Sequence, residues 1–146
     1  MAVSDSEYGK MAKKISPPSP KGLNIIKAFL IGGIISALGE GLGMIYERAG
    51  IGEKGVKALV PITLIVITAV LTALGLFDKI AKHAGAGTIV PITGFANAVV
   101  SPAMEFQSEG RILGTGAEMF RIAGPVIVYG SCASVIYGFI YWIFQK

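Results

Sequence analysis

The sequence predicts an all-α integral membrane protein with three full transmembrane helices, an interrupted or re-entrant third hydrophobic segment and a mixed-polarity helix. Fifty-three per cent of the 146 residues are apolar and 15% are charged, whereas an average soluble domain has roughly 25% charged residues. The apolar residues gather in long runs, and roughly 20 such residues form a helix that spans the hydrocarbon core. In lipid these runs must be helices, because their backbone polar groups have to be hydrogen-bonded within the chain.

Residues 1–24 are polar and precede a single membrane domain that we expect at 25–146. Pro17, Pro18 and Pro20 lie close together, which favours an extended or disordered arm. The basic residues that flank the first apolar run are Lys10, Lys13, Lys14, Lys21 and Lys27. Such a flank is typical of a cytoplasmic tail beside anionic lipid. Because no aromatic residue is interleaved with these lysines, we expect no nucleic-acid partner.

The first span is expected at 28–46 and combines small residues with one charged residue. Its glycines would let a neighbouring helix approach closely; they are Gly32, Gly33, Gly39, Gly41 and Gly43. Glu40 lies within this span, where a carboxylate is costly unless it faces water or a partner, or is protonated. Two interpretations stay open: Glu40 faces a water-filled path, or it lies near the membrane interface.

The second span is expected at 58–77 and contains no charged residue. Pro61 falls in its first turn, where the missing N–H costs little, and Asp78 ends the span. The short loop that follows contains Gly85 and Gly87, which predict either a flexible hinge or a close approach of the backbone to another segment.

The third apolar stretch, 88–104, contains Pro91, Pro102, a glycine and Asn97. A continuous span is possible, but a pair of half-helices is better supported, with its break around 91–97 or at 101–102. Interrupted hydrophobic segments mark ion and solute paths, because the freed backbone groups must face protein or water. If this stretch crosses the membrane, the C-terminus returns to the cytoplasmic side; if it re-enters, the C-terminus lies on the opposite side.

Polar residues within and after this stretch are candidates for the path. Thr93 and Asn97, one turn apart, could line it or could hydrogen-bond within a helix pair. Glu105 and Glu109 share a face if the mixed segment 105–124 is an interfacial or half-buried helix, and they would attract a cation or open water. The last span is expected at 125–144, with its proline at the first helical position.

No catalytic arrangement is recognisable in the sequence. His83 and Cys132 are the single histidine and the single cysteine, so neither a zinc motif nor a disulfide framework can form from them. No nucleophile lies in a G-x-S-x-G context, and no glycine-rich loop ends in Lys-Ser or Lys-Thr. We therefore expect a protein that is not an enzyme and has no catalytic residues, no metal site and no cofactor.

The segment 84–110 resembles the signature of the SpoVA membrane proteins of endospore-forming bacteria. It reads AGAGTIVPITGFANAVVSPAMEFQSEG. The segments 27–42, 74–79 and 116–130 look similar to that family too, and the resemblance covers roughly 21–146. Two sister members of the family share the motif, and the basic tail before the first span is similar to that of one of them.

The resemblance implies a function that the composition does not. SpoVA proteins move dipicolinic acid, with calcium, across the inner membrane of the forespore and spore, loading it in sporulation and releasing it in germination. It implies a tension-gated, channel-forming subunit in a homo- or hetero-oligomer, whose partners are a sister SpoVAE-type membrane subunit and a soluble SpoVAD-type protein. The alternative is a non-conducting scaffold or assembly subunit of the same complex.

The site residues rest on the residues themselves and not on the resemblance. We expect the path to be lined by Glu40, Thr93, Asn97, Glu105 and Glu109, with Gly85 and Gly87 as its hinge. Half-helix ends suit dipicolinate, a flat dianion with a nearly neutral calcium chelate, because free N–H groups favour carboxylates and free carbonyls coordinate calcium.

Overall fold

The computed structural model describes residues 7–9, 11 and 20–145, which form helices and turns without a strand. The remainder of the expected arm and the last residue lie outside the described residues. The helices after residue 20 are α2 (Lys21–Arg48), α3 (Glu53–Ala73), α4 (Phe77–Ala84), α5 (Ala86–Ile89), α6 (Ile92–Glu105), η1 (Gln107–Glu109), η2 (Arg111–Gly116) and α7 (Ala117–Phe144). Residues 21–24, which the composition places in the arm, form the first turn of α2.

Three segments are long and apolar enough to cross a membrane, namely Lys21–Arg48, Glu53–Ala73 and Arg111–Phe144. The predicted all-α membrane fold with three full spans is therefore confirmed. The expected end of the second span at residue 77 is wrong, because α3 ends at Ala73 and Phe77 begins α4. Gly75, with a φ of +65°, turns the chain between them, and glycine adopts this left-handed conformation without steric cost.

The expected interruption of the third stretch is confirmed, and it lies at Val90 and Pro91, between α5 and α6. Pro91 has no N–H to continue the hydrogen bonds of α5, and its ψ of 166° leads the chain out of the helix. The second expected break is wrong, because Pro102 lies inside α6. The helix continues past Pro102, and the Phe106 amide donates to the Pro102 carbonyl at 3.0 Å.

The mixed segment 105–124 is divided and does not form one helix. Glu105 ends α6, η1 is a single 3-10 turn, η2 is a π-helical turn, and α7 starts at Ala117. Gly110, with a φ of +99°, separates η1 from η2. Because α7 begins before residue 125, Pro125 lies within this helix and not at its first position.

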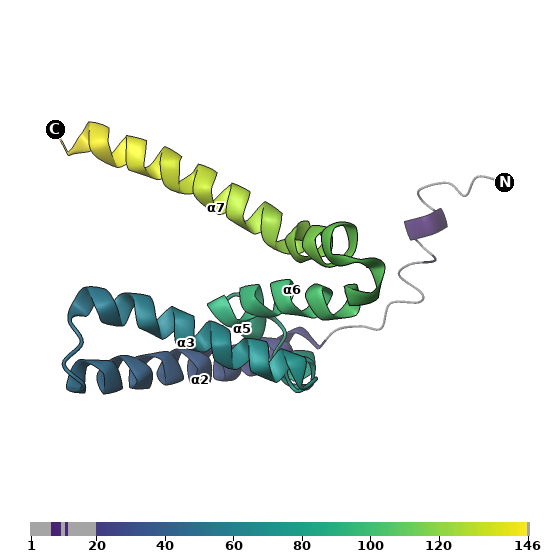
Figure 1. The fold of residues 1–146 in the computed structure, drawn as a ribbon, viewed down its shortest axis with the longest axis horizontal. Coiled ribbons are helices and arrows are strands. Elements are labelled where there is room, and N and C mark those ends of the chain that lie inside the picture. The colour runs from purple at the N-terminus through teal and green to yellow at the C-terminus, as the bar shows by residue number, and fades with distance from the viewer. Residues whose placement is uncertain (1–6, 10, 12–19, 146) are drawn as a thin grey trace.

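Figure 1 shows how these elements run between the two ends of the molecule. Helices α2 and α3 form an antiparallel pair, and α4 lies at the end where α3 finishes. The chain then turns back through α5, α6 returns to that same end, and α7 runs to the opposite end. Segment 77–105 therefore begins and ends at the same end of the molecule.

This arrangement predicts that the two ends of the membrane domain lie on opposite sides of the bilayer. Three crossings reverse the side of the chain, whereas a fourth would restore it. Cysteines introduced at Gln145 and at Ser4, which lies outside the described residues, should react with an impermeant thiol reagent from opposite sides in a Cys132→Ser background. Labelling of both from the same side would contradict the re-entrant arrangement.

Glycines bring α2 close to its neighbours. A Cβ atom on Gly39 would lie 3.6 Å from Leu64, and one on Gly32 would lie 3.5 Å from the Gly87 carbonyl oxygen. The hydroxyls of Tyr46 and Thr63, 2.6 Å apart, join α2 to α3 near one end of the pair. This side of α2 thus packs on α3 and α5, as small residues allow in lipid.

Candidate solute path at the broken segment

Two turns shape the broken segment. Gly85 joins α4 to α5 with a φ of 50° and a ψ of −123°, and the Thr88 hydroxyl donates to its carbonyl at 3.1 Å. At the break, the Val90 amide donates to the Ala86 carbonyl at 3.2 Å, and the Gly94 amide donates to the Pro91 carbonyl at 2.9 Å. These hydrogen bonds hold the chain in a defined turn that joins the single turn of α5 to the first turn of α6.

Gly87 and Gly94 lie where backbone segments meet without room for a side chain. A Cβ atom on Gly87 would clash with the Ala28 carbonyl oxygen and lie 3.0 Å from the Ala28 Cα. One on Gly94 would clash with the Thr88 carbonyl oxygen and lie 2.5 Å from that of Ile89. The structure thus places Gly85, the first of the expected hinge residues, at a turn, and Gly87, the second, at a close approach between α5 and α2.

Polar side chains meet where α6 packs on α3. The Thr72 hydroxyl donates to Asn97 Oδ1 at 2.9 Å and joins the two helices. One turn earlier on each helix lie Thr68, whose hydroxyl donates to the Leu64 carbonyl at 2.8 Å, and Thr93. Thr68 and Thr72, which sequence reasoning missed as partners, repeat at the spacing of Thr93 and Asn97. The four-residue spacing of Thr68 and Thr72 places them on one face of α3, and this spacing could have indicated that they face the polar residues of another helix.

Thr93 has a polar atom that the described residues do not satisfy. Its side chain is buried, and Oγ1 has no hydrogen-bond partner among the described residues. A buried hydroxyl in this state costs about 1–3 kcal/mol. The Asn97 amide nitrogen likewise has no acceptor among the described residues. One turn of α6 beside the break therefore presents two polar groups that can bind water or a passing solute.

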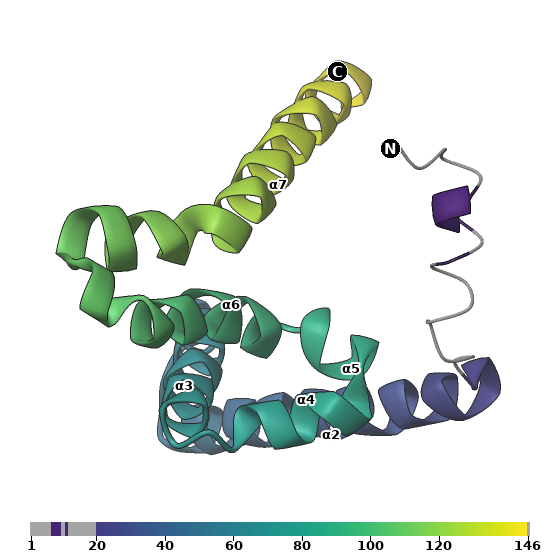
Figure 2. The same ribbon diagram turned by 90° about the vertical axis from the view of Figure 1, so that its right-hand side faces the viewer.

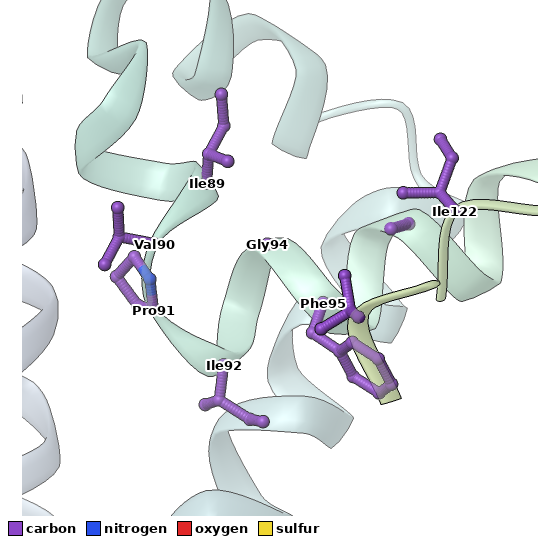
Figure 3. A pocket seen from close by; sticks show the side chains of 9 residues that line it. Ile89, Val90, Pro91, Ile92, Gly94, Phe95 and Ile122 are labelled. Atoms are coloured by element: carbon purple, nitrogen blue, oxygen red, sulfur yellow. The ribbon is translucent and has the colours of Figure 1, made fainter. Parts of the chain in front are cut away.

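Cavities flank the break on both sides. One of ≈ 450 Å³ lies between the break and α7 and is lined by residues that include Pro91, Phe95 and Ile122, which Figure 3 shows around the turn. Another of ≈ 380 Å³ lies among α2, α3 and the broken segment, and Thr68, Thr88 and Thr93 contribute to its lining. Apolar side chains form most of both walls, and of the expected path residues Thr93 alone lines either of these two cavities.

The comparisons with known proteins identify the family. The family described as SpoVAC/SpoVAEB sporulation membrane protein matches residues 24–140. The chain belongs to this family. Stage V sporulation protein AC of Bacillus subtilis (strain 168) is 44% identical over 140 residues, which cover 95% of this chain and 93% of that protein. Of the two sister members that share the motif, the one with a basic tail like that of this chain is SpoVAC, and this match confirms the expected likeness. No solved structure matches the chain.

The match to the SpoVAC/SpoVAEB family covers the whole broken segment and its partner helices α2 and α3. The residues expected to line a path therefore lie within the part of the chain that is characteristic of sporulation membrane proteins. The match begins after the polar arm and ends within α7.

The acidic candidates do not gather around the break. Glu105 is the last residue of α6 and Glu109 lies in η1, and both are exposed. Because the α-helix ends before Phe106, the two carboxylates do not share one face of an α-helix. Glu40 lies about two turns before the end of α2, and this end is opposite the end of α6 in Figure 1. Within the described residues, no group of three acidic, histidine or cysteine side chains could hold a metal ion.

Glu40 itself is exposed on the surface of α2. Neither an ion pair nor a hydrogen bond to its carboxylate is formed by the described residues. Its neighbour Gly39 packs on α3, whereas a Cβ atom on Gly41 would have no heavy atom within 4 Å. Glu40 thus belongs to a side of α2 that a single chain leaves uncovered, where only water or another subunit can satisfy the charge.

Proposed function

We propose that this chain is a channel-forming subunit that moves dipicolinic acid, with calcium, across the inner membrane of the forespore and spore in sporulation and germination. The observation that carries the proposal is the break between α5 and α6, beside which the buried Thr93 hydroxyl lacks a partner among the described residues. Membership in a family of sporulation membrane proteins supports it. We propose a transport role and no enzymatic one.

The chemistry of the break suits this solute. The N-terminus of α6 presents backbone N–H groups, which favour carboxylates, and the carbonyl oxygens of Thr88 and Ile89 lie against Gly94 in the same turn. Carbonyl oxygens are ligands that calcium accepts. Dipolar walls of this kind attract both forms of the solute without binding either too tightly to conduct.

The apolar walls beside the break and the position of Glu40 support an oligomer. One chain does not bring Glu40 together with Glu105 or Glu109, so a path lined by all three would be completed between subunits. Residues 125–144 of α7 are all exposed as well. We propose a sister SpoVAE-type subunit as the membrane partner, a soluble SpoVAD-type protein at the surface, and gating by membrane tension.

The alternative function is a non-conducting scaffold of the same complex, and one observation favours it. The hydrogen bond from Thr72 to Asn97 satisfies part of the amide within a helix pair. A scaffold would use its polar residues in this way, to hold helices together.

Flux measured in liposomes distinguishes these two functions. The purified protein is reconstituted alone and with its sister subunit, and dipicolinate release is followed with and without osmotic tension. Flux that depends on this chain, and that tension increases, supports the channel. If the sister alone conducts as fast as the pair and this chain alone does not conduct, the scaffold is the correct function.

Glu40→Gln should alter dipicolinate flux or its pH response while expression and assembly stay normal. The change keeps the shape of the side chain and removes the charge that would face water. The matched control is Glu47→Gln, near the end of the same helix and also exposed. Loss of assembly with Glu40→Gln would show a buried partner role, and normal flux with normal assembly would leave Glu40 a tolerated interfacial residue.

The N-terminus is proposed to face the cytoplasm, which is the core in a spore. The lysines of the tail outnumber the basic residues of the next loop, which are Arg48, Lys54 and Lys57, and an excess of lysine and arginine marks the cytoplasmic side. A cysteine at Ser4 should therefore be protected from an impermeant reagent added outside. Labelling from outside would reverse the orientation of the whole domain.

A further inference from the structure

A basic pocket lies outside the broken segment, where the first turns of α2 meet the C-terminal end of α4. Its volume is ≈ 340 Å³, and its polar lining includes Asn24, Lys82 and His83. Figure 2 shows α4 running alongside α2, with the first turns of α2 extending beyond the C-terminal end of α4. Ile25, Ala28 and Ala84 add apolar surface to the same pocket. Its walls thus combine cationic and apolar groups.

The positive charge of this pocket is not neutralised within the part of the chain that the structure describes. The Lys82 ammonium forms neither an ion pair nor a hydrogen bond there, although Asp78 lies one turn before it on α4. His83 Nδ1 is 2.9 Å from the Lys79 carbonyl oxygen. Because a carbonyl can only accept, Nδ1 is the donor in this contact, and Nε2 donates to an anion when the imidazole carries both protons.

The beginning of α2 adds to the positive potential. Within the described residues this helix has no acidic residue in its first turn and no side-chain cap, so the positive end of its dipole adds to the potential there. Lys21 and Lys27 lie one turn to either side of Asn24. Their charges act in the same direction as that of Lys82, because they lie on turns of α2 next to the pocket residues Asn24 and Ile25.

We propose that this pocket binds an anion that carries carboxylate or phosphate groups beside an apolar part. Lys82 provides the charge, the doubly protonated form of His83 donates a hydrogen bond from Nε2, and the apolar wall accommodates the rest of the ligand. Two sources offer this chemistry: the headgroup of an anionic phospholipid and a free aromatic dicarboxylate such as dipicolinate. The site does not depend on the transport proposed above, because a lipid headgroup would fill it in a protein that conducts nothing.

The test uses the full chain in nanodiscs of zwitterionic phosphatidylcholine. Dipicolinate binding is measured by calorimetry, and phosphatidylglycerol binding is measured by native mass spectrometry after lipid exchange. Lys82→Gln should weaken binding of the true ligand about tenfold, the effect of losing one charge-assisted contact. Lys79→Gln is the matched control: it removes the same charge from the same helix but lies outside the pocket, and it should change binding less than about twofold.

Each outcome has a definite meaning. Binding of phosphatidylglycerol alone identifies the lipid headgroup as the source, and binding of dipicolinate alone identifies the solute. The proposal is overturned if neither anion binds, or if Lys79→Gln weakens binding as much as Lys82→Gln, because the attraction would then be a diffuse property of the surface. Both lysines are exposed, so unchanged thermal midpoints should show that the variants fold normally.

Discussion

Spores that carry Asn97→Leu should release dipicolinate at least about tenfold more slowly, while the variant still inserts and assembles with its partners. Leucine has nearly the shape of asparagine but removes the amide, which lies one turn along α6 from Thr93 and is bonded to Thr72 on α3. The remaining Thr72 hydroxyl can donate to the carbonyl one turn before it on α3, so the helix pair should tolerate the change. Release is measured by the appearance of dipicolinate in the medium after a germinant is added.

Thr72→Val is the matched control for this prediction. It breaks the same 2.9 Å hydrogen bond but leaves the Asn97 amide in place. If Asn97 lines the path, Thr72→Val should slow release much less than Asn97→Leu. Equal slowing would show that the hydrogen bond between α3 and α6 is what matters, and normal release with Asn97→Leu would remove this residue from the path.

Gly87→Ala and Gly94→Ala should each destabilise the membrane domain by about 1–3 kcal/mol, the usual cost of overpacking. The new methyl group would meet backbone atoms and not a flexible side chain, at Ala28 in the first case and at Thr88 and Ile89 in the second. Backbone cannot give way cheaply, so the contact of α5 with α2 or the turn into α6 must open. The thermal midpoint in detergent, followed by circular dichroism, measures the loss.

Gly33→Ala is the control, since a Cβ atom there would have no heavy atom within 4 Å. It lies in α2 beside Gly32, which packs against Gly87, so it tests the same helix without the contact. Its midpoint should stay the same or rise, because alanine is the better helix former. If Gly87→Ala melts like Gly33→Ala, the close approach of α5 to α2 is not important for stability.

The spans and the break followed from local features of the sequence. Charge-free runs in a lipid environment allow only helices, and Pro91 lacks the N–H that would continue the hydrogen bonds of α5. Pro102 and Pro125 carry the same local signal, yet both lie inside helices. Whether a proline breaks a helix or is absorbed by it depends on the neighbouring helices, which a sequence does not specify.

The partners of the candidate site could not be predicted for a related reason. The pairing of Asn97 with Thr72 depends on how α6 crosses α3, a contact between distant parts of the chain. Likewise, Gly32 packs on α5 and Gly33 faces outward, although the two are adjacent and chemically identical. The rotation of α2 about its axis decides this difference, and it also decides that Glu40 faces away from α3.

The most direct test of the central claim, that dipicolinate passes the turn between α5 and α6, is chemical block of flux at Asn97. In a Cys132→Ser background, Asn97→Cys is reconstituted in liposomes with the sister subunit and treated with a small charged thiol reagent. Modification should stop dipicolinate flux, dipicolinate should slow the modification, and a cysteine at the exposed Lys54 should react without effect on flux. Full flux after complete modification at position 97 would contradict the claim.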